Sequence, residues 1–142
     1  MIALDSNVWI YAFDAGLDEH AGVAPAVEDL LSSETPVFVN SVIRLEVVHY
    51  LVKNLRTDGG SAGPDSFLNL DGVVTKAVTS EDVKRAAEIL SEHDETGLGG
   101  RDASLVASME GAGVSVLWTH DTGLKRLGDR LGWLDVRDPV NE

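Results

Sequence analysis

The sequence predicts an α/β fold, a three-layer α/β/α sandwich around a mostly parallel central sheet. Short apolar runs rich in β-branched residues alternate along the chain with longer segments whose apolar residues recur at helical spacing. The length of 142 residues fits a single domain, residues 1–142, that buries a core of its own. The absence of cysteine excludes a disulfide scaffold, a thiolate metal site and a cysteine nucleophile.

Four strands are expected, each a short apolar run that ends at a polar or turn-forming residue. They are residues 2–4, 37–39, 73–78 and 114–118. Each is separated from the next by a segment long enough to contain a helix, which is the connection that neighbouring parallel strands require. This order of strand and helix favours a parallel sheet with helices covering both faces.

Two helices are expected before the third strand. The first covers residues 24–31, where apolar residues stand at helical spacing, and it ends in a Ser-Ser-Glu-Thr-Pro segment. The second is capped by Ser41 and runs to about Asn54, with an apolar stripe of Ile43, Val47, Tyr50 and Leu51. The glycine-rich segment from Asp58 to Pro64 is the clearest break in the chain and predicts a surface loop, whose role is left open.

Three further helices are expected in the second half. Thr79 or Ser80 caps the first of them, and acidic residues in its first turn suit the positive end of the helix dipole. Its expected buried stripe is Val83, Ala86, Ala87 and Leu90. The second covers residues 101–111 after a glycine-rich break, and the third is a short basic helix around Lys125 and Arg126.

The chain is strongly acidic, with 24 Asp and Glu against 11 Lys and Arg, a net charge of −13 and a pI near 4.5. Two explanations compete. The carboxylates form a solubility coat suited to the salt-rich cytoplasm of a salt-adapted organism, where charge repulsion is screened within ~3 Å near 1 M salt, or some of them gather to hold a cation. No apolar run approaches the ~18 residues of a membrane span, so a cytoplasmic protein with no membrane association is expected.

Two acidic residues stand just beyond the ends of predicted strands. Asp5 comes after the first strand and Asp121 after the fourth. In open α/β folds, ligands bind beyond the carboxyl ends of the strands, which makes both residues candidates for a functional site. The competing interpretation is that each is an ordinary turn or helix-capping residue.

Two more acidic residues lie inside apolar helical stripes. Glu46 lies between Ile43 and Tyr50 on the apolar face of its helix, and Asp102 shares a face with Leu105. Charges on an inward face are tolerated when they are paired or metal-bound. The competing interpretations are an ion pair for Glu46, with an arginine such as Arg101, and helix N-terminal stabilisation for Asp102.

Convergence of these four carboxylates would require a cation. At ~5 Å and an effective dielectric near 20, each like-charge pair costs about 3 kcal/mol. An all-oxygen ligand set suits Mg²⁺ or Mn²⁺. Phosphodiester hydrolysis is a reaction that such a site supports, because the metal activates water and offsets charge on the phosphate.

The order of the polar motifs resembles that of the PIN-domain nucleases, and in particular the VapC-type toxins of type II toxin–antitoxin pairs. The motifs are Asp5-Ser6-Asn7, Ser41 followed by Glu46, the helix start at Arg101-Asp102, and Thr119-His120-Asp121. The resemblance extends from Met1 to about Leu134. Leu124 departs from it, because the family often has an aromatic residue there.

The resemblance implies a metal-dependent endoribonuclease of PIN-like fold. Asp5, Glu46, Asp102 and Asp121 would be the catalytic and metal-binding acids, with Mg²⁺ (or Mn²⁺) as cofactor. Asn7, Ser41 and Thr119 would orient those carboxylates, and Arg101, Lys125 and Arg126 would contact RNA. An antitoxin partner and a homodimer are also implied. The alternatives are an RNA-processing PIN nuclease that is not a toxin, a silent PIN-like binding module, and, with less support, a phosphatase of the haloacid-dehalogenase type.

Overall fold

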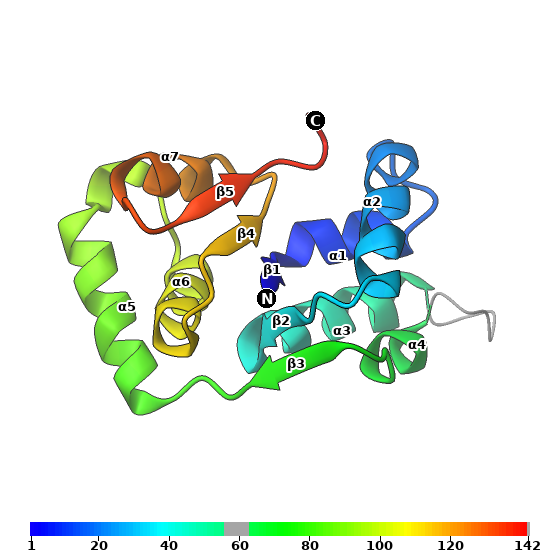
Figure 1. Cartoon of the computed structure of the whole chain (residues 1–142), viewed down its shortest axis with the longest axis horizontal. Coiled ribbons are helices and arrows are strands. Elements are labelled where there is room, and N and C mark those ends of the chain that lie inside the picture. The colour runs from blue at the N-terminus through cyan, green and yellow to red at the C-terminus, as the bar shows by residue number, and fades with distance from the viewer. Residues whose placement is uncertain (56–62, 142) are drawn as a thin grey trace.

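The computed structural model describes residues 1–55 and 63–141, which form a five-stranded sheet flanked by helices (Figure 1). The strand order is β3-β2-β1-β4-β5, and every pairing is parallel. The strands are β1 (Ile2–Leu4), β2 (Val37–Asn40), β3 (Val73–Lys76), β4 (Val116–Trp118) and β5 (Asp135–Arg137). The chain builds β1, β2 and β3 outward in one direction and then returns to place β4 on the other side of β1.

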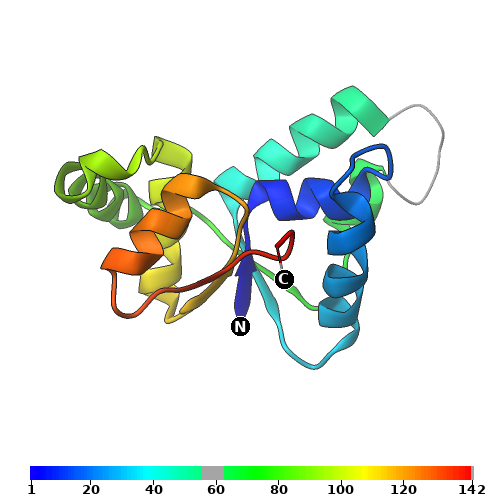
Figure 2. The same cartoon turned by 90° about the horizontal axis from the view of Figure 1, so that it is seen from above.

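The helices cover both faces of this sheet. They are α1 (Ser6–Phe13), α2 (His20–Ser32), α3 (Ser41–Leu55), α4 (Pro64–Leu68), α5 (Ser80–Glu92), η2 (Asp94–Thr96), α6 (Gly100–Ala112) and α7 (Thr122–Arg130). Figure 2 shows α1 and α2 on one side of the strands and α6 and α7 on the other, which confirms the three-layer α/β/α prediction. No helix in the described part of the chain is both long and apolar enough to cross a membrane.

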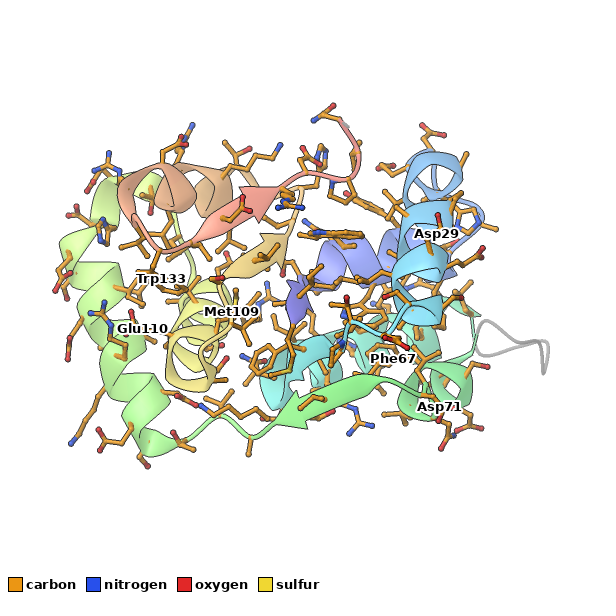
Figure 3. The ribbon with its side chains drawn as sticks, viewed as in Figure 1. Asp29, Phe67, Asp71, Met109, Glu110 and Trp133 are labelled. Atoms are coloured by element: carbon orange, nitrogen blue, oxygen red, sulfur yellow. The ribbon has the colours of Figure 1, made fainter. Side chains whose placement is uncertain are left out.

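The core lies between the sheet and each helical layer. On one side the ring of Trp9 packs edge-on against Phe67, with ring centroids 5.1 Å apart, and Phe13 packs on Phe67 at 5.8 Å. On the other side Met109, on α6, is fully buried. Phe67 and Met109 mark these two halves of the core in Figure 3.

Four elements were not expected from the sequence, one of them the single turn of η2. Helix α1 has the sequence SNVWIYAF, whose β-branched and aromatic residues do not form a helical stripe. Helix α4 begins at a proline, and β5 has the sequence DVR, in which a single apolar residue stands between two charges. Strand β5 exists because β4 supplies its hydrogen-bonding partner.

The predicted buried stripe of α5 was partly wrong. Val83 is 58% exposed and Ala87 is also exposed, whereas Ala86 and Ile89 are buried. Helix α5 packs on α6, and the side chains that it buries are Asp82, Ala86 and Ile89, one row along the helix. Its start was predicted correctly: Thr79 caps it, and Asp82 completes a reciprocal capping box.

The predicted cap of α3 was also wrong. The Asn40 side chain accepts a hydrogen bond from the Ile43 backbone N–H at 2.8 Å, so Asn40 caps the helix and Ser41 is its first residue. Of the predicted glycine-rich loop from Asp58 to Pro64, residues 58–62 lie outside the described residues. Pro64 begins α4.

Candidate active site

Asp5 lies at the carboxyl end of β1 and caps helix α1. Its Oδ1 accepts a hydrogen bond from the Ser6 backbone N–H at 2.7 Å, and its Oδ2 accepts one from the Thr119 hydroxyl at 2.7 Å. The residue is 3% exposed. Each carboxylate oxygen retains acceptor capacity beyond these bonds, so Asp5 is held rigidly while it remains able to bind a further group.

Thr119 joins the ends of the two central strands. It follows β4, is fully buried, and accepts a hydrogen bond from the Asp121 backbone N–H at 3.0 Å while donating to Asp5. Asp121 caps α7 by accepting from the Leu124 N–H at 2.9 Å. Strands β1 and β4 are neighbours where the strand order reverses, which is the position where open α/β sheets bind ligands.

The charges of three carboxylates act on one another beyond the carboxyl ends of β1 and β4. Burial raises the pKa of Asp5 to about 6; the Thr119 hydrogen bond opposes the rise, and the negative charges of Asp102 and Asp121 add to it. Burial and the charge of Asp121 also raise the pKa of Asp102, which lies in the first turn of α6. Raised carboxyl pKa values indicate negative charges that lack a full counter-charge.

Glu46 reaches the same group from α3. Its carboxylate forms an ion pair with Arg101, the residue immediately before Asp102, and its charge contributes to the raised pKa of Asp102. The ion pair that the sequence offered as the competing interpretation for Glu46 is therefore present. It does not separate Glu46 from the other acids, because Arg101 and Asp102 are consecutive residues.

The four predicted acids therefore lie at one edge of the fold, each near enough to another for their charges to interact. They do not form a closed cage: in residues 1–55 and 63–141, no three His, Cys, Asp or Glu side chains form a ready-made metal cluster. Repulsion between like charges and the hold of Arg101 on Glu46 oppose tighter approach. The donor set is entirely carboxylate oxygen, which fits a hard divalent cation.

The other predicted site residues differ in what they contact. Asn7 accepts a hydrogen bond from the His120 backbone N–H at 3.4 Å, which ties α1 to the segment after β4. Ser41 instead accepts from the Val78 N–H at 3.0 Å, outside the carboxylate group. Lys125 forms an ion pair with Asp138, and Arg126 is exposed on α7.

Sequence reasoning missed Asn40, which connects the two helices that carry Glu46 and Asp102. Fully buried at the end of β2, it caps α3 and donates to the hydroxyls of Ser108 at 3.1 Å and Ser104 at 3.5 Å, both on α6. An asparagine directly after a predicted strand and before a helix was the signal that could have found it.

Asp138 was missed as well, and it organises the segment beside the site. Its carboxylate accepts hydrogen bonds from His120 Nδ1 at 3.0 Å, from Lys125, from the Val140 N–H at 3.0 Å and from Asn141 at 2.7 Å. Although burial acts in the opposite direction, these donors lower the pKa of Asp138 to about 2. The sequence offers no signal for this role, because Asp-Pro reads as an ordinary turn.

We expect Asp138→Asn to destabilise the fold in a pH-dependent way. The pKa falls from 3.8 to about 2 on folding, so the ionised carboxylate contributes roughly 2 kcal/mol above pH 4, a contribution lost as the pH falls through 2. Denaturant unfolding of the wild type and of Asp138→Asn at pH 7 and pH 2.5 measures the difference in their free energies of unfolding, which should be smaller at pH 2.5. Asp135→Asn is the control, since Asp135 is half exposed and pairs with Arg137. Equal losses for both variants at pH 7 would contradict the expectation.

Solved structures similar to this fold include a toxin and a toxin–antitoxin complex. VapC20 of Mycobacterium tuberculosis, described as a sarcin–ricin-loop-cleaving toxin, matches with a TM-score of 0.73 and 22% identity over 90% of this chain and 95% of that one. VapBC2 of Rickettsia felis, bound to promoter DNA, matches with a TM-score of 0.69 and 18% identity over 97% of this chain and 98% of that one. FitAcB of Neisseria gonorrhoeae matches with a TM-score of 0.67 and 18% identity over 98% of each chain.

Comparison with curated proteins gives no match. The family model described as PIN domain matches residues 2–130, which include all four acids together with Asn7, Ser41 and Thr119. The similar structures share the fold over nearly the whole chain. This chain therefore belongs to the PIN-domain family.

Proposed function

We propose that this protein is a divalent-metal-dependent endoribonuclease that hydrolyses RNA phosphodiester bonds and acts as the toxin of a toxin–antitoxin pair. The observation that supports this most directly is the meeting of Asp5, Asp102 and Asp121 beyond the carboxyl ends of two adjacent parallel strands. Their mutual repulsion makes the group a poor structural element and a good cation site.

The residues of the site have two tasks, metal binding and the positioning of the metal-binding acids. Asp5, Glu46, Asp102 and Asp121 would hold Mg²⁺ or Mn²⁺, which when bound would activate water and offset charge on the phosphate. Thr119 fixes the orientation of Asp5 through its hydroxyl hydrogen and that of the Asp121 backbone through its hydroxyl oxygen. With a pKa of about 6, Asp5 is largely ionised at neutral pH, the form that binds a cation.

Basic residues near the acids would contact the RNA. Arg101 is largely exposed at the start of α6, and Lys125 and Arg126 lie on α7, which Asp121 caps. The net charge of −13 repels a polyanion at long range. Local cations are therefore needed for RNA to approach the carboxylates.

The proposed partners are an antitoxin and a second copy of the chain. Structures similar in fold include toxin–antitoxin complexes such as VapBC2. The strongly acidic charge of this chain would favour a partner segment rich in Lys and Arg. A neighbouring reading frame encoding a small DNA-binding protein with a basic tail, and light scattering that shows a dimer at tens of micromolar, would support these assignments.

The direct test is cleavage of RNA by the purified chain with Mg²⁺, with Mn²⁺ and with EDTA, followed by sequencing of the new ends. We expect cleavage at defined internal positions with either metal and none with EDTA. The same sequence made as DNA is the substrate control.

The outcomes separate the competing functions. RNA binding without cleavage in either metal would indicate a binding module. Cleavage restricted to a precursor RNA, without growth arrest on expression, would indicate a processing nuclease. Cleavage that persists in EDTA would contradict the metal-dependent proposal.

A further inference from the structure

Arg101 and Glu46 form an ion pair at the rim of the carboxylate group. Glu46 comes from α3 and its side chain is 22% exposed, whereas the Arg101 side chain, in the first turn of α6, is 68% exposed. The guanidinium is therefore fixed at one point while most of the side chain faces solvent. Arg101 can leave into water at little cost, whereas the Glu46 Oε2 that it contacts is buried and then needs another cation.

The charge of Arg101 reaches beyond Glu46. Arg101 directly precedes Asp102 in the first turn of α6, so its charge lies beside a second member of the carboxylate group. Among the cations described near these acids, Arg101 is the one paired with a member of the group, because Lys125 pairs with Asp138 and Arg130 with Glu95. Arg101 thus supplies part of the positive charge that a bound metal would supply.

There is room beside the pair for Arg101 to move. A groove of about 610 Å³ runs along α3, bordered by Glu46 and Arg101 and lined by apolar side chains such as Leu45 and Val52. The aliphatic part of an arginine packs well on apolar surface while its guanidinium remains in water. A released Arg101 can therefore lay its aliphatic part along this groove while its guanidinium stays in water.

We propose that Arg101 is an exchangeable counter-ion of the metal site. It neutralises Glu46 while the site is free, and a divalent cation that takes Glu46 displaces it. The released guanidinium then binds a phosphate of the RNA, for which its planar pair of donors is well suited. This inference rests on the proposed function and adds a coupling to it: metal binding prepares the RNA-binding residue.

The first test is Mn²⁺ binding measured by calorimetry in the absence of RNA. Arg101→Gln should bind Mn²⁺ more tightly than the wild type, by about 3- to 10-fold, because the metal no longer competes with a cation. Arg85→Gln is the matched control. Arg85 pairs with Glu110 at 2.8 Å between α5 and α6, away from the carboxylate group, and Figure 3 labels Glu110 there. This control should leave Mn²⁺ affinity unchanged.

The second test is RNA binding in Ca²⁺ and in EDTA. Arg101→Gln should weaken binding clearly in Ca²⁺ and little in EDTA, where the wild-type guanidinium is occupied by Glu46. Arg101→Lys keeps the charge without the paired donors, so it should restore wild-type Mn²⁺ affinity and part of the RNA affinity. If the ion pair had a purely structural role, Arg101→Gln would not raise the Mn²⁺ affinity, and its effect on RNA binding would be the same in Ca²⁺ and in EDTA.

The outcomes distinguish this inference from the proposed function. If the wild type binds Mn²⁺ and Arg101→Gln binds it equally or less well, the counter-ion role is overturned and the nuclease proposal stands. If neither protein binds Mn²⁺, both are overturned. If Arg101→Gln alone binds Mn²⁺, the cation does not displace Arg101 in the wild type, and both the exchange and the metal-dependent proposal for the wild-type chain are overturned.

Discussion

Asp102→Asn should lower the rate of RNA cleavage by at least about 10³-fold and leave RNA binding unchanged or slightly stronger. A metal ion contributes several kcal/mol to phosphodiester hydrolysis, and each 1.36 kcal/mol is a factor of ten in rate. Asn has nearly the same shape as Asp but lacks the charge that holds the cation. Loss of one negative charge also reduces repulsion of the RNA.

The fold should survive this change. Asp102 lies in the first turn of α6, where an acidic residue stabilises the helix by about 0.3–1 kcal/mol, but its pKa is raised by burial and by Asp121. The two effects oppose each other, so the melting temperature should change little. Cleavage kinetics under single-turnover conditions, with a binding assay in Ca²⁺, separate the catalytic effect from the binding effect.

Asp29→Asn is the matched control, because it removes one negative charge from an exposed position on α2, a helix that carries none of the four acids; Figure 3 labels Asp29 there. It should cleave RNA at the wild-type rate. Cleavage by Asp102→Asn within tenfold of wild type would remove Asp102 from the catalytic group. Loss of RNA binding with Mn²⁺ binding intact would show that the acid acts on the substrate rather than on the metal.

Asp5→Asn should make the metal-free protein more stable at neutral pH. The pKa of Asp5 rises from 3.8 to about 6 on folding, so the folded state binds the proton more tightly than the unfolded chain does. Ionisation therefore costs nothing below pH 3.8 and lowers stability by about 3 kcal/mol above pH 6. Asn removes this cost and still caps α1, but it accepts fewer hydrogen bonds, so a net gain of about 1–2 kcal/mol is expected.

This gain should reverse when metal is present. A cation that binds the folded state alone stabilises the wild type by about 2.7 kcal/mol at a hundred times its Kd, which is roughly 5–11 °C in melting temperature for a chain of this size. Asp5→Asn should lose most of that shift, and the double variant with Asp102→Asn nearly all of it. The melting temperatures of the wild type and the variants are measured by thermal unfolding in EDTA and in Mn²⁺, each at pH 7.5 and at pH 4.

The reversal is the informative result. The variant should melt above wild type in EDTA at pH 7.5 and below it in saturating Mn²⁺, and the EDTA advantage should shrink at pH 4. Asp29→Asn should show neither effect. A variant less stable than wild type in EDTA at pH 7.5 would mean that the hydrogen bonds to Ser6 and Thr119 outweigh the burial of the charge.

Much of the fold could be predicted because local preferences and tertiary packing agree. The apolar runs predicted as strands correspond to β1 to β4 of one parallel sheet, of which β3, at the edge, is partly exposed. The capping signal at Thr79 marks a true helix start. Asp5 and Asp121 could be selected because they follow strands whose carboxyl ends meet. Glu46 and Asp102 could be selected because each is a charge within an apolar stripe.

The tertiary structure alone decided which polar groups meet. Asn40 looks like a cap in sequence, but its bonds to Ser104 and Ser108 depend on α6 packing against the end of β2. Asp138 lies in a short tail segment, and its four donors come from separate parts of the C-terminal region, including Lys125 on α7. Strand β5 forms because β4 offers a free edge. Periodicity and capping are local properties of a sequence, whereas the partner of a buried polar group is chosen by how distant elements pack.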